Sequence, residues 1–464
     1  YAEADTVSIG SFIFTPGINT ILATATLTGD TLQENDTIKD SRFMCTIMMG
    51  GQYVIGASAS ADYPSFDSLM VDVLRCGINS NLSLKYESGT YAENWDLSNL
   101  SNIMGGYTLT ISSLSGNRNS VIIRPSSGVA ITLNNTHNLI VKDITIDNRG
   151  SIAYGVEFAS SARRIKFRNI YFMGDTLGTT AANAPAPIYK ASGSGVVDDV
   201  RFIGNLIEGG YYGIYLYGGN SSSAYGTNVV IDSNIMRNQY YYANYFYYVD
   251  FNSISHNTML SRRTSTNTYW YGIRSYYCNF VADGNKIHQR STAITSPYLV
   301  YIYYAGYYNA SQPSLFCNNE LIGSSSTTYY AMYLGTYNVL NVYNNSIYMD
   351  GTGASRCIYI ASSTSSSFDF KNNIIVNASS SGHVVYFAGT TTPCISDYNC
   401  LYSPGNIGYF SSSYTTLAAW QSATGTDVHS ISVNPSFVDV SSSLELLDYR
   451  PFVVPMLTDI TKDI

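Results

Sequence analysis

Short runs of alternating hydrophobic and polar residues recur along most of this chain, and many contain the pattern Φ-x-x-Asn-x-Φ, where Φ is hydrophobic. The asparagines of this pattern are Asn205, Asn234, Asn257, Asn285, Asn319, Asn345, Asn373 and Asn399, and by subtraction neighbouring copies lie 23 to 34 residues apart. Most copies have large apolar flanks, such as Phe202 and Ile207, whereas Ala282 and Ser396 hold the first position in two copies. Strict alternation predicts strands with one buried face.

The period of the repeat predicts a β-solenoid. Repeats of about 20–50 residues are typical of solenoids and propellers, but a propeller blade needs about 40 residues and four strands. The repeat is too short for a blade and fits one turn of a parallel β-helix with two or three strands. Asparagine tolerates left-handed backbone angles at a bend, and its amide can bond to the next coil. We therefore expect the eight asparagines to form an internal ladder with a structural role.

The flanking regions predict further elements. Residues 1–45 contain alternating runs around Pro16-Gly17 and are expected to be part of a β-sandwich. Residues 46–100 are expected to cap the solenoid and include a helix at 65–77, with Phe66, Leu69, Met70, Val73 and Leu74 as its apolar stripe. The β-helix itself is expected over 101–450, and 451–464 is expected to be a linker or the start of another module.

Composition narrows the classes of partner. The net charge is −8, and only 24 of 464 residues are Lys or Arg, so the protein lacks the positive surface that nucleic acid requires. No run of about 18 apolar residues is present, so no membrane span is predicted. Charged residues make up 12% of the sequence, about half the usual share, whereas 43 residues are Tyr. Such a surface suits uncharged hydrogen-bonding partners.

Neither cofactors nor metals are predicted. The seven cysteines show no zinc spacing. Cys394 and Cys400 are near enough in sequence to pair, but most of the seven lie in apolar runs and are interpreted as buried free thiols. Asp232 and Asp283 share a position in the repeat with Ser255 between them, so a calcium site is possible but is not predicted.

Two segments resemble a known family. Asp62-Tyr63-Pro64-Ser65-Phe66, Gly77-Ile78-Asn79 and 87–93 resemble the entry of right-handed parallel β-helix domains of the pectate-lyase-like superfamily, as found in large secreted bacterial surface proteins. The tail is similar too, in 397–402, Trp420, Gly425, 429–431 and 434–439. The resemblance covers about residues 50–450. It implies an all-β, right-handed parallel β-helix in an extracellular protein, but the superfamily includes lyases, hydrolases, esterases and non-catalytic adhesins.

Enzymes of this superfamily act on polysaccharides, and one column of charges is a candidate for such chemistry. Short matches to hydrolase motifs, Arg164-Ile165-Lys166 and Asp198-Asp199, occur in the wrong order and are interpreted as chance. Alignment on the Asn places Arg237 and His288 at one offset and Arg262 and Arg290 at another. Arg262 or Arg290 would bind a uronate carboxylate, and His288 would be the base. The alternative, which we favour, is that these charges keep the sheet soluble.

Tyrosines gather between residues 234 and 345, often as neighbours. Because neighbouring side chains of a strand alternate in direction, at least one Tyr of each pair must point outward. The candidate ligand-binding residues are Tyr241, Tyr247, Trp270, Tyr276, Tyr303 and Tyr307. Such a rigid aromatic face suits stacking on sugar rings or docking of a protein. The competing interpretation, at equal weight, is that the rings only stabilise the sheet.

The leading functional hypothesis is therefore an extracellular surface or adhesin-type module that binds a glycan or a partner protein through this face, without catalysis. The alternatives are a polysaccharide lyase or glycoside hydrolase and a structural stalk.

Overall fold

The computed structural model describes residues 13–437. Within that span it leaves out 16, 27, 30, 32–36, 46–48, 99–104, 151–152, 194, 220–223, 264–265, 290, 292, 307–311, 336–338, 362–366 and 390–393. The predicted segment 451–464 lies outside the described residues.

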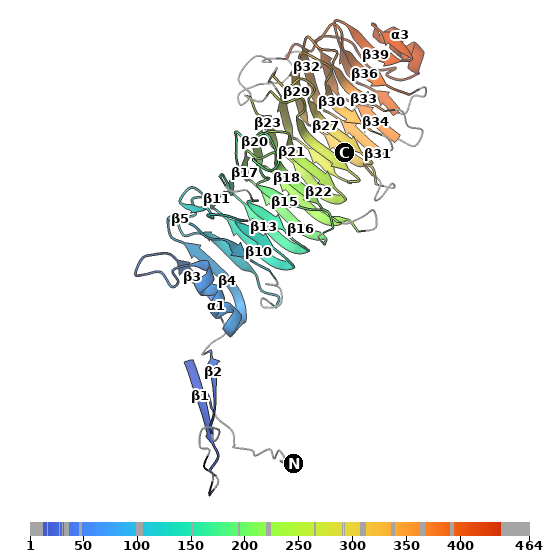
Figure 1. Cartoon of the computed structure of the whole chain (residues 1–464). Coiled ribbons are helices and arrows are strands. Elements are labelled where there is room, and N and C mark those ends of the chain that lie inside the picture. The colour runs from blue at the N-terminus through green and yellow to red at the C-terminus, as the bar shows by residue number, and fades with distance from the viewer. Residues whose placement is uncertain are drawn as a thin grey trace.

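The protein folds as an all-β, right-handed parallel β-helix of about 11 turns, as predicted (Figure 1). Each turn contributes one strand to each of three sheets, and neighbouring strands of a sheet come from successive turns. Sheet 1 consists of β3 (Met49–Ile55), β4 (Ile78–Tyr86), β7 (Leu109–Ser113), β10 (Thr136–Lys142), β13 (Ala162–Arg168), β16 (Val197–Ile203), β19 (Gly226–Asp232), β22 (Val249–Ser255), β25 (Val281–Asp283), β28 (Ser314–Cys317), β31 (Val339–Tyr343), β34 (Ser367–Lys371) and β37 (Cys394–Asp397).

Sheets 2 and 3 are built in the same way. Sheet 2 consists of β5 (Gly89–Tyr91), β8 (Val121–Ile123), β11 (Thr145–Asp147), β14 (Tyr171–Met173), β17 (Leu206–Glu208), β20 (Ile235–Gln239), β23 (Thr258–Ser261), β26 (Lys286–Gln289), β29 (Glu320–Ser325), β32 (Ser346–Gly351), β35 (Ile374–Asn377) and β38 (Cys400–Tyr402). Sheet 3 consists of β6 (Trp95–Asp96), β9 (Ile131–Leu133), β12 (Val156–Phe158), β15 (Ile188–Lys190), β18 (Tyr212–Tyr217), β21 (Tyr242–Tyr247), β24 (Tyr271–Tyr276), β27 (Tyr298–Tyr303), β30 (Tyr330–Leu334), β33 (Arg356–Ile360), β36 (His383–Phe387) and β39 (Asn406–Phe410). At its C-terminal edge, β40 (Ser412–Tyr414) follows β39 directly and pairs with it antiparallel.

Inward side chains of the three sheets form one continuous core. In sheet 2, for example, Ile207, Met236 and Met259 lie at one register position on successive coils and are fully buried. Identical or similar side chains thus stack on one another along the axis, and in sheet 1 the rings of Phe167 and Phe202 stack 5.5 Å apart. The alternation read from the sequence places these residues inside because successive strand side chains point to opposite faces.

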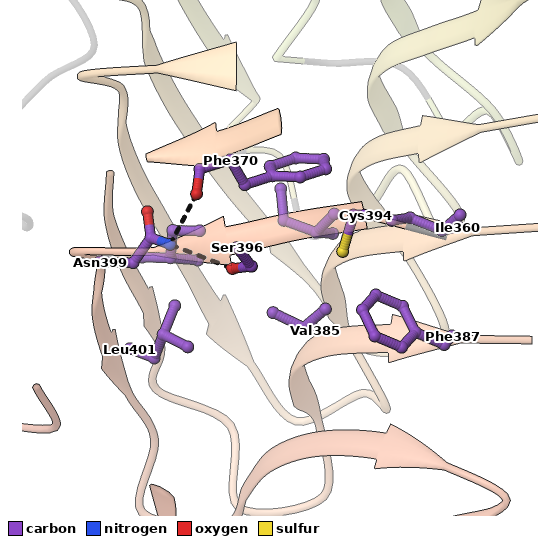
Figure 2. Close-up of a pocket in the computed structure, with 10 residues that line it drawn as sticks. Ile360, Phe370, Val385, Phe387, Cys394, Ser396, Asn399 and Leu401 are labelled. Carbon is purple, nitrogen blue, oxygen red and sulfur yellow. Dashed lines mark hydrogen bonds between the residues drawn. The ribbon is translucent and has the colours of Figure 1, made fainter. Parts of the chain in front are cut away.

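The predicted asparagine ladder is present. All eight asparagines are at most 1% exposed. The side-chain amide of Asn257, which represents the others, donates to Asn285 Oδ1 at 2.9 Å and to the carbonyl of Ile231 at 2.9 Å. The same pattern runs from Asn205 to Asn399, whose Nδ2 donates to Phe370 O and to Ser396 at 3.1 Å each (Figure 2) and to Asp427 Oδ1 at 3.2 Å.

The expected backbone geometry of the ladder needs one correction. The left-handed residue at each bend is the one before the ladder asparagine; it is Asn318, Asn344 or Asn372 in three coils and Gly204 or Gly284 in two others. Asn and Gly adopt this conformation at low cost. The ladder asparagine itself supplies hydrogen bonds rather than the turn.

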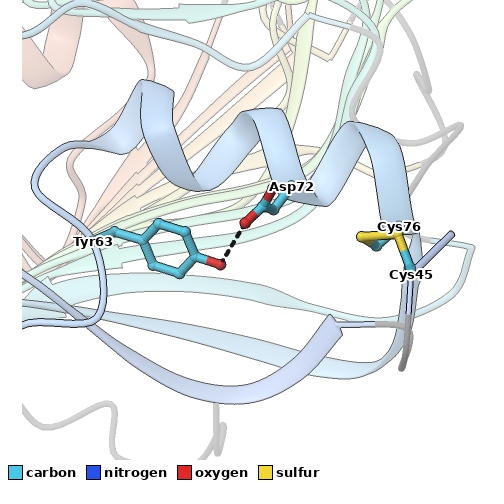
Figure 3. Close-up of a disulfide and its surroundings, with 4 residues drawn as sticks. All are labelled: Cys45, Tyr63, Asp72 and Cys76. Atoms are coloured by element: carbon cyan, nitrogen blue, oxygen red, sulfur yellow. Dashed lines mark hydrogen bonds between the residues drawn. A yellow bond between two sulfur atoms is a disulfide. The ribbon is translucent and has the colours of Figure 1, made fainter. Parts of the chain in front are cut away.

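A helix, α1 (Phe66–Cys76), covers the N-terminal end of the solenoid, close to its predicted range. Ser65 caps it through the backbone N–H of Ser68, and Phe66, Leu69 and Val73 are buried, whereas Leu74 of the expected stripe is 64% exposed. Figure 3 shows how the helix is fixed: the hydroxyl of Tyr63 donates to Asp72 at 3.0 Å, and Cys76 forms a disulfide with Cys45.

The disulfide was not predicted. The other five cysteines, Cys278, Cys317, Cys357, Cys394 and Cys400, are free and mostly buried, in line with their interpretation as buried thiols. Burial raises the pKa of the Cys278 thiol to about 12, so this thiol is unreactive at neutral pH.

Two further elements lie outside the coils. Strands β1 (Gly17–Thr24) and β2 (Thr37–Met44) pair antiparallel, and their assignment to a β-sandwich stays a prediction. At the far end, α3 (Leu417–Thr424) places Trp420 in the core, 5.1 Å from the ring of Phe387. No helix among the described residues is long and apolar enough to cross a membrane.

Candidate functional site: the tyrosine face

Tyrosines on the outer face of sheet 3 form columns that run along the solenoid axis. Strands β18, β21, β24 and β27 pair in register, so that outward residues of successive coils lie directly beside one another. We call this surface the tyrosine face. Its first column is Tyr212, Tyr242, Tyr271, Tyr298 and Tyr330; its second is Tyr189, Tyr215, Tyr245, Arg274, Tyr301, Tyr333, Tyr359, Tyr386 and Tyr409; its third is Tyr217, Tyr247, Tyr276 and Tyr303.

Rings within a column stack face to face. The ring centroids of Tyr217 and Tyr247 are 4.6 Å apart with an interplanar angle of 3°, and those of Tyr301 and Tyr333 are 4.7 Å apart at 2°. This spacing matches the distance of about 4.8 Å between neighbouring strands. The face of each ring is therefore covered by the next ring in the same column. A ligand on this surface would meet ring edges and hydroxyl groups, which corrects the expected stacking on sugar rings.

Neighbouring columns pack edge to face. The rings of Tyr242 and Tyr245, for example, lie 5.1 Å apart at 73°. Tyr242 and Tyr271 are consequently only 7% and 8% exposed, and the face is a dense layer of phenols. Burial raises the pKa of Tyr245 to about 12 and that of Tyr333 to about 12. The hydroxyls stay protonated at neutral pH and can both donate and accept hydrogen bonds.

Arg274 interrupts the second column. Its guanidinium carbon lies 5.1–5.4 Å from the ring centroids of five tyrosines: Tyr242, Tyr245, Tyr271, Tyr276 and Tyr301. It donates hydrogen bonds to the hydroxyls of Tyr242 at 2.6 Å and Tyr276 at 2.8 Å. The cation therefore binds all three columns together through cation–π contacts.

Not every predicted ligand-binding residue lies on this face. Tyr247, Tyr276 and Tyr303 belong to its third column, and Tyr241 lies beside it, stacked on Tyr211 at 5.1 Å. Tyr307 lies outside the described residues. Trp270 is a wrong prediction, because its side chain is fully buried in the core. The stretch Tyr269-Trp270-Tyr271 alternates in direction, and its central residue points inward.

The candidate catalytic column on sheet 2 has its predicted register, with Glu208, Arg237, Leu260 and His288 on successive coils. Its charges, however, are paired within the protein. Arg237 Nε donates to Glu208 Oε1 at 3.0 Å, and His288 Nε2 lies 2.6 Å from Glu320 Oε1 with only 3% of its side chain exposed. Burial acts to raise the pKa of Glu208, but hydrogen bonds from Tyr171 and Asn238 and the charge of Arg237 outweigh it. The pKa of this carboxyl group is therefore lowered from its usual value.

The two remaining candidates do not add to that column. Arg262 is 4% exposed and donates to the carbonyls of Asn238 at 2.9 Å and Gly178 at 3.0 Å, so it holds the long excursion of residues 174–186 against the coils. Arg290 lies outside the described residues. The described members of the set therefore have structural contacts, and their catalytic role stays a prediction.

Two hollows deserve comparison with these surfaces. One lies inside the core near Asn399 and holds about 10 Å³, room for about one water (Figure 2). The other is an open depression of about 280 Å³ on the outer face of sheet 1, lined by Thr108, Asn138, Ile140, Arg164, Ile165, Lys166, Asp199 and Arg201. Arg164, Lys166 and Asp199 come from the short motifs that the sequence analysis attributed to chance. Among the described residues, no group of three or more His, Cys, Asp or Glu is placed to hold a metal ion.

Comparison with known proteins does not assign this protein to a family. No protein-family model and no curated protein sequence matches this one. Among solved structures, the Dettilon tailspike protein gp208 is similar with 12% identity and a TM-score of 0.35 over 72% of this chain and 64% of that one. Geobacillus virus E2 ORF18 has 11% identity and a TM-score of 0.24, covering 74% of this chain and 56% of that one.

A third similar structure is the A-module of the Azotobacter vinelandii mannuronan C-5 epimerase AlgE6, with 10% identity, a TM-score of 0.20 and coverage of 76% and 91%. The chain thus spans about two thirds or less of the two viral proteins. At these identities and TM-scores, no conclusion about fold or function follows from the similarity.

Proposed function

We propose that this protein is an extracellular surface module that binds a glycan through its tyrosine face, without catalysis. The observation that supports the proposal is the repetition of phenolic hydroxyls in register, coil after coil, on one sheet. A polymer with regularly spaced hydroxyls can bond to such a surface at several points at once. Because the rings are held by stacking, little side-chain entropy is lost when a ligand binds.

An extracellular location is supported by the disulfide between Cys45 and Cys76. Disulfides persist in oxidising compartments and are rare in the cytosol. A low share of charged residues on a sheet rich in hydroxyls is also the composition that suits a neutral partner.

The mode of binding can be tested by removing hydroxyls while keeping rings. In affinity electrophoresis against a panel of neutral and acidic polysaccharides, Tyr241→Phe and Tyr276→Phe should each weaken retention about 2- to 10-fold, the value of one hydrogen bond of about 0.5–1.5 kcal/mol. Tyr402→Phe, on sheet 2, is the matched control and should change nothing. Equal retention of all three variants, or no retention of the wild type by any polymer, would refute glycan binding through this face.

The same panel tests the enzyme alternative. Release of unsaturated or shortened products by the wild type, lost in His288→Ala, would replace binding with catalysis as the leading function. A partner protein in place of a glycan would leave every polysaccharide unbound.

A further inference from the structure

Positive charge is concentrated on three neighbouring strands of sheet 1. Strands β10, β13 and β16 lie side by side near the N-terminal end of the solenoid (Figure 1). Together they carry six Lys or Arg and two Asp, a net charge of 6 − 2 = +4, in a protein whose net charge is −8. The six cations are Lys142, Arg163, Arg164, Lys166, Arg168 and Arg201. A quarter of the 24 basic residues therefore lie in 21 positions.

Three of these cations surround the open depression of about 280 Å³. In-register pairing places Ile140, Lys166 and Arg201 side by side on successive coils. Arg164 lies on the same strand as Lys166, at a break in the pairing. The depression has a mixed lining, with Ile140 as its apolar side chain and Thr108 and Asn138 as uncharged polar groups, whereas the side chain of Ile165 is buried in the core.

The backbone at this place is unusual. Asn138, Arg164 and Asp199, one from each strand, all have positive φ, of 58°, 54° and 50°. Asn and Asp tolerate this conformation, but for Arg it costs about 1–2 kcal/mol. Residues held in such conformations often cluster at ligand sites. Here the distortion turns the Arg164 side chain toward the depression, where its Nε donates to Asn138 Oδ1.

Much of the positive charge is available to a ligand. Among the described residues, Lys166 has no ion pair or hydrogen bond, and Arg164 uses only Nε. Arg201 is paired with Asp199 at 2.7 Å, and the other aspartate, Asp198, is paired with Arg163 at 2.9 Å outside the depression. Burial, and then the charges of Arg164 and Arg163, lower the pKa of the neighbouring His137.

We infer that this depression binds an acidic sugar unit through its carboxylate or sulfate group, at a site separate from the tyrosine face. The two terminal nitrogens of Arg164 and the ammonium of Lys166 would hold the anion, and Ile140 would contact the apolar face of the ring. Guanidinium groups can bind two oxygens of a carboxylate or of a sulfate with two parallel hydrogen bonds.

Size and charge favour a saccharide over other polyanions. The lining extends over three coils, or about 10 Å, which is room for one or two sugar rings, and its charged residues come from β13 and β16. Nucleic acid is bound through many cation contacts along its phosphate backbone, and the flanking coils do not continue the row: the positions beside Arg201 and Lys166 are Val230 on β19 and Ile140 on β10.

The experiment measures binding of the whole 464-residue chain to four polymers by calorimetry at about 50 mM and about 200 mM NaCl. The polymers are an oligouronate, a sulfated glycan, neutral dextran and polyglutamate. We expect the uronate, the sulfated glycan or both to bind, more weakly at the higher salt, and dextran to give no salt-dependent binding. The stronger of the two acidic glycans identifies the anionic group.

Two variants and one matched control locate the site. Lys166→Met and Arg164→Gln should each reduce affinity for the acidic glycan about tenfold or more, the value of a charge-assisted hydrogen bond. Arg168→Met removes the same charge from the same strand outside the depression and should change affinity less than about twofold. Circular dichroism confirms that all three fold.

Several results would overturn the inference. Equal weakening by Arg168→Met would mean diffuse attraction rather than a site. Polyglutamate bound as tightly as the glycans would indicate an acidic peptide as the ligand, and no binding of either acidic glycan at low salt would exclude the site. Loss of acidic-glycan binding in Tyr241→Phe or Tyr276→Phe would assign the anion to the tyrosine face. If both variants bind the acidic glycan as the wild type does, the site on sheet 1 is independent of the tyrosine face, and the two proposals stand or fall separately.

Discussion

Replacement of one ladder asparagine by alanine should destabilise the solenoid far more than the loss of one small side chain would suggest. In Asn257→Ala, the backbone N–H and the amide Nδ2–H of Asn234 lose their shared acceptor, Asn257 Oδ1, at 3.0 and 2.9 Å. Both donors are buried, and each costs about 1–3 kcal/mol when left unpaired. We therefore expect a loss of about 2–6 kcal/mol in the free energy of unfolding, measured by guanidinium denaturation at neutral pH.

Two further variants separate the hydrogen bonds from simple loss of packing. Asn252→Ala, on the exposed side of the same coil, should change stability by no more than about 0.5 kcal/mol. Asn257→Asp keeps the volume, but its ionised form cannot donate to Ile231 O or Asn285 Oδ1 and its protonated form can donate to only one of them, so it should also be strongly destabilised. Burial would raise the pKa of that carboxyl group, so the loss should grow as pH rises. If Asn257→Ala matches Asn252→Ala, or Asn257→Asp is as stable as the wild type, the ladder does not stabilise the fold as argued.

Three other predictions concern the faces and the cap. Arg274→Met should lower stability by about 2 kcal/mol in thermal unfolding, because five rings lose their cation, whereas Arg274→Tyr should lose less because it completes the second column. Burial lowers the pKa of Lys190 to about 8. Between pH 8 and 10 the unfolded state therefore binds more protons than the folded state, and the free energy of unfolding of the wild type should rise by about 2 kcal/mol. In Lys190→Met, which has no amine to titrate, this rise should be absent. Replacing Cys45 and Cys76 by Ser should cost about 3–4 kcal/mol, because their bridge closes a loop over a sequence separation of 31, and amide exchange should localise the loss to α1 and its neighbours.

The fold could be predicted from the sequence because the residues that determine it recur once in each turn. A side chain such as Asn257 is repeated at the same place in each turn, and alternation fixed which residues, such as Met236 and Ile287, point inward. Even in the coils before Asn205 the register is continuous, although Ile144 and Ile170 replace asparagine after the left-handed residues Asp143 and Asn169.

The sites were harder to predict because they depend on partners that periodicity does not identify. Arg262 was assigned to a catalytic cluster, but its partner Gly178 is 84 residues away in an excursion that no repeat specifies. Trp270 was placed outside because a run of three aromatics does not reveal which one points inward. The depression on sheet 1 joins Arg164, Lys166 and Asp199 across coils of unequal length, so its motifs looked unrelated in the sequence.

The orientation of the ladder has an electrical consequence. From Asn205 to Asn399 the amide Nδ2–H of each asparagine points toward the next coil and its Oδ1 points back, so the amide dipoles add along the axis as peptide dipoles do in an α-helix. The positive end of this row meets the carboxylate of Asp427, which is 1% exposed and also accepts bonds from Trp420 and Ser430. The closing segment thus supplies a counter-charge to the whole stack, and replacing Asp427 by Asn would remove it from the interior.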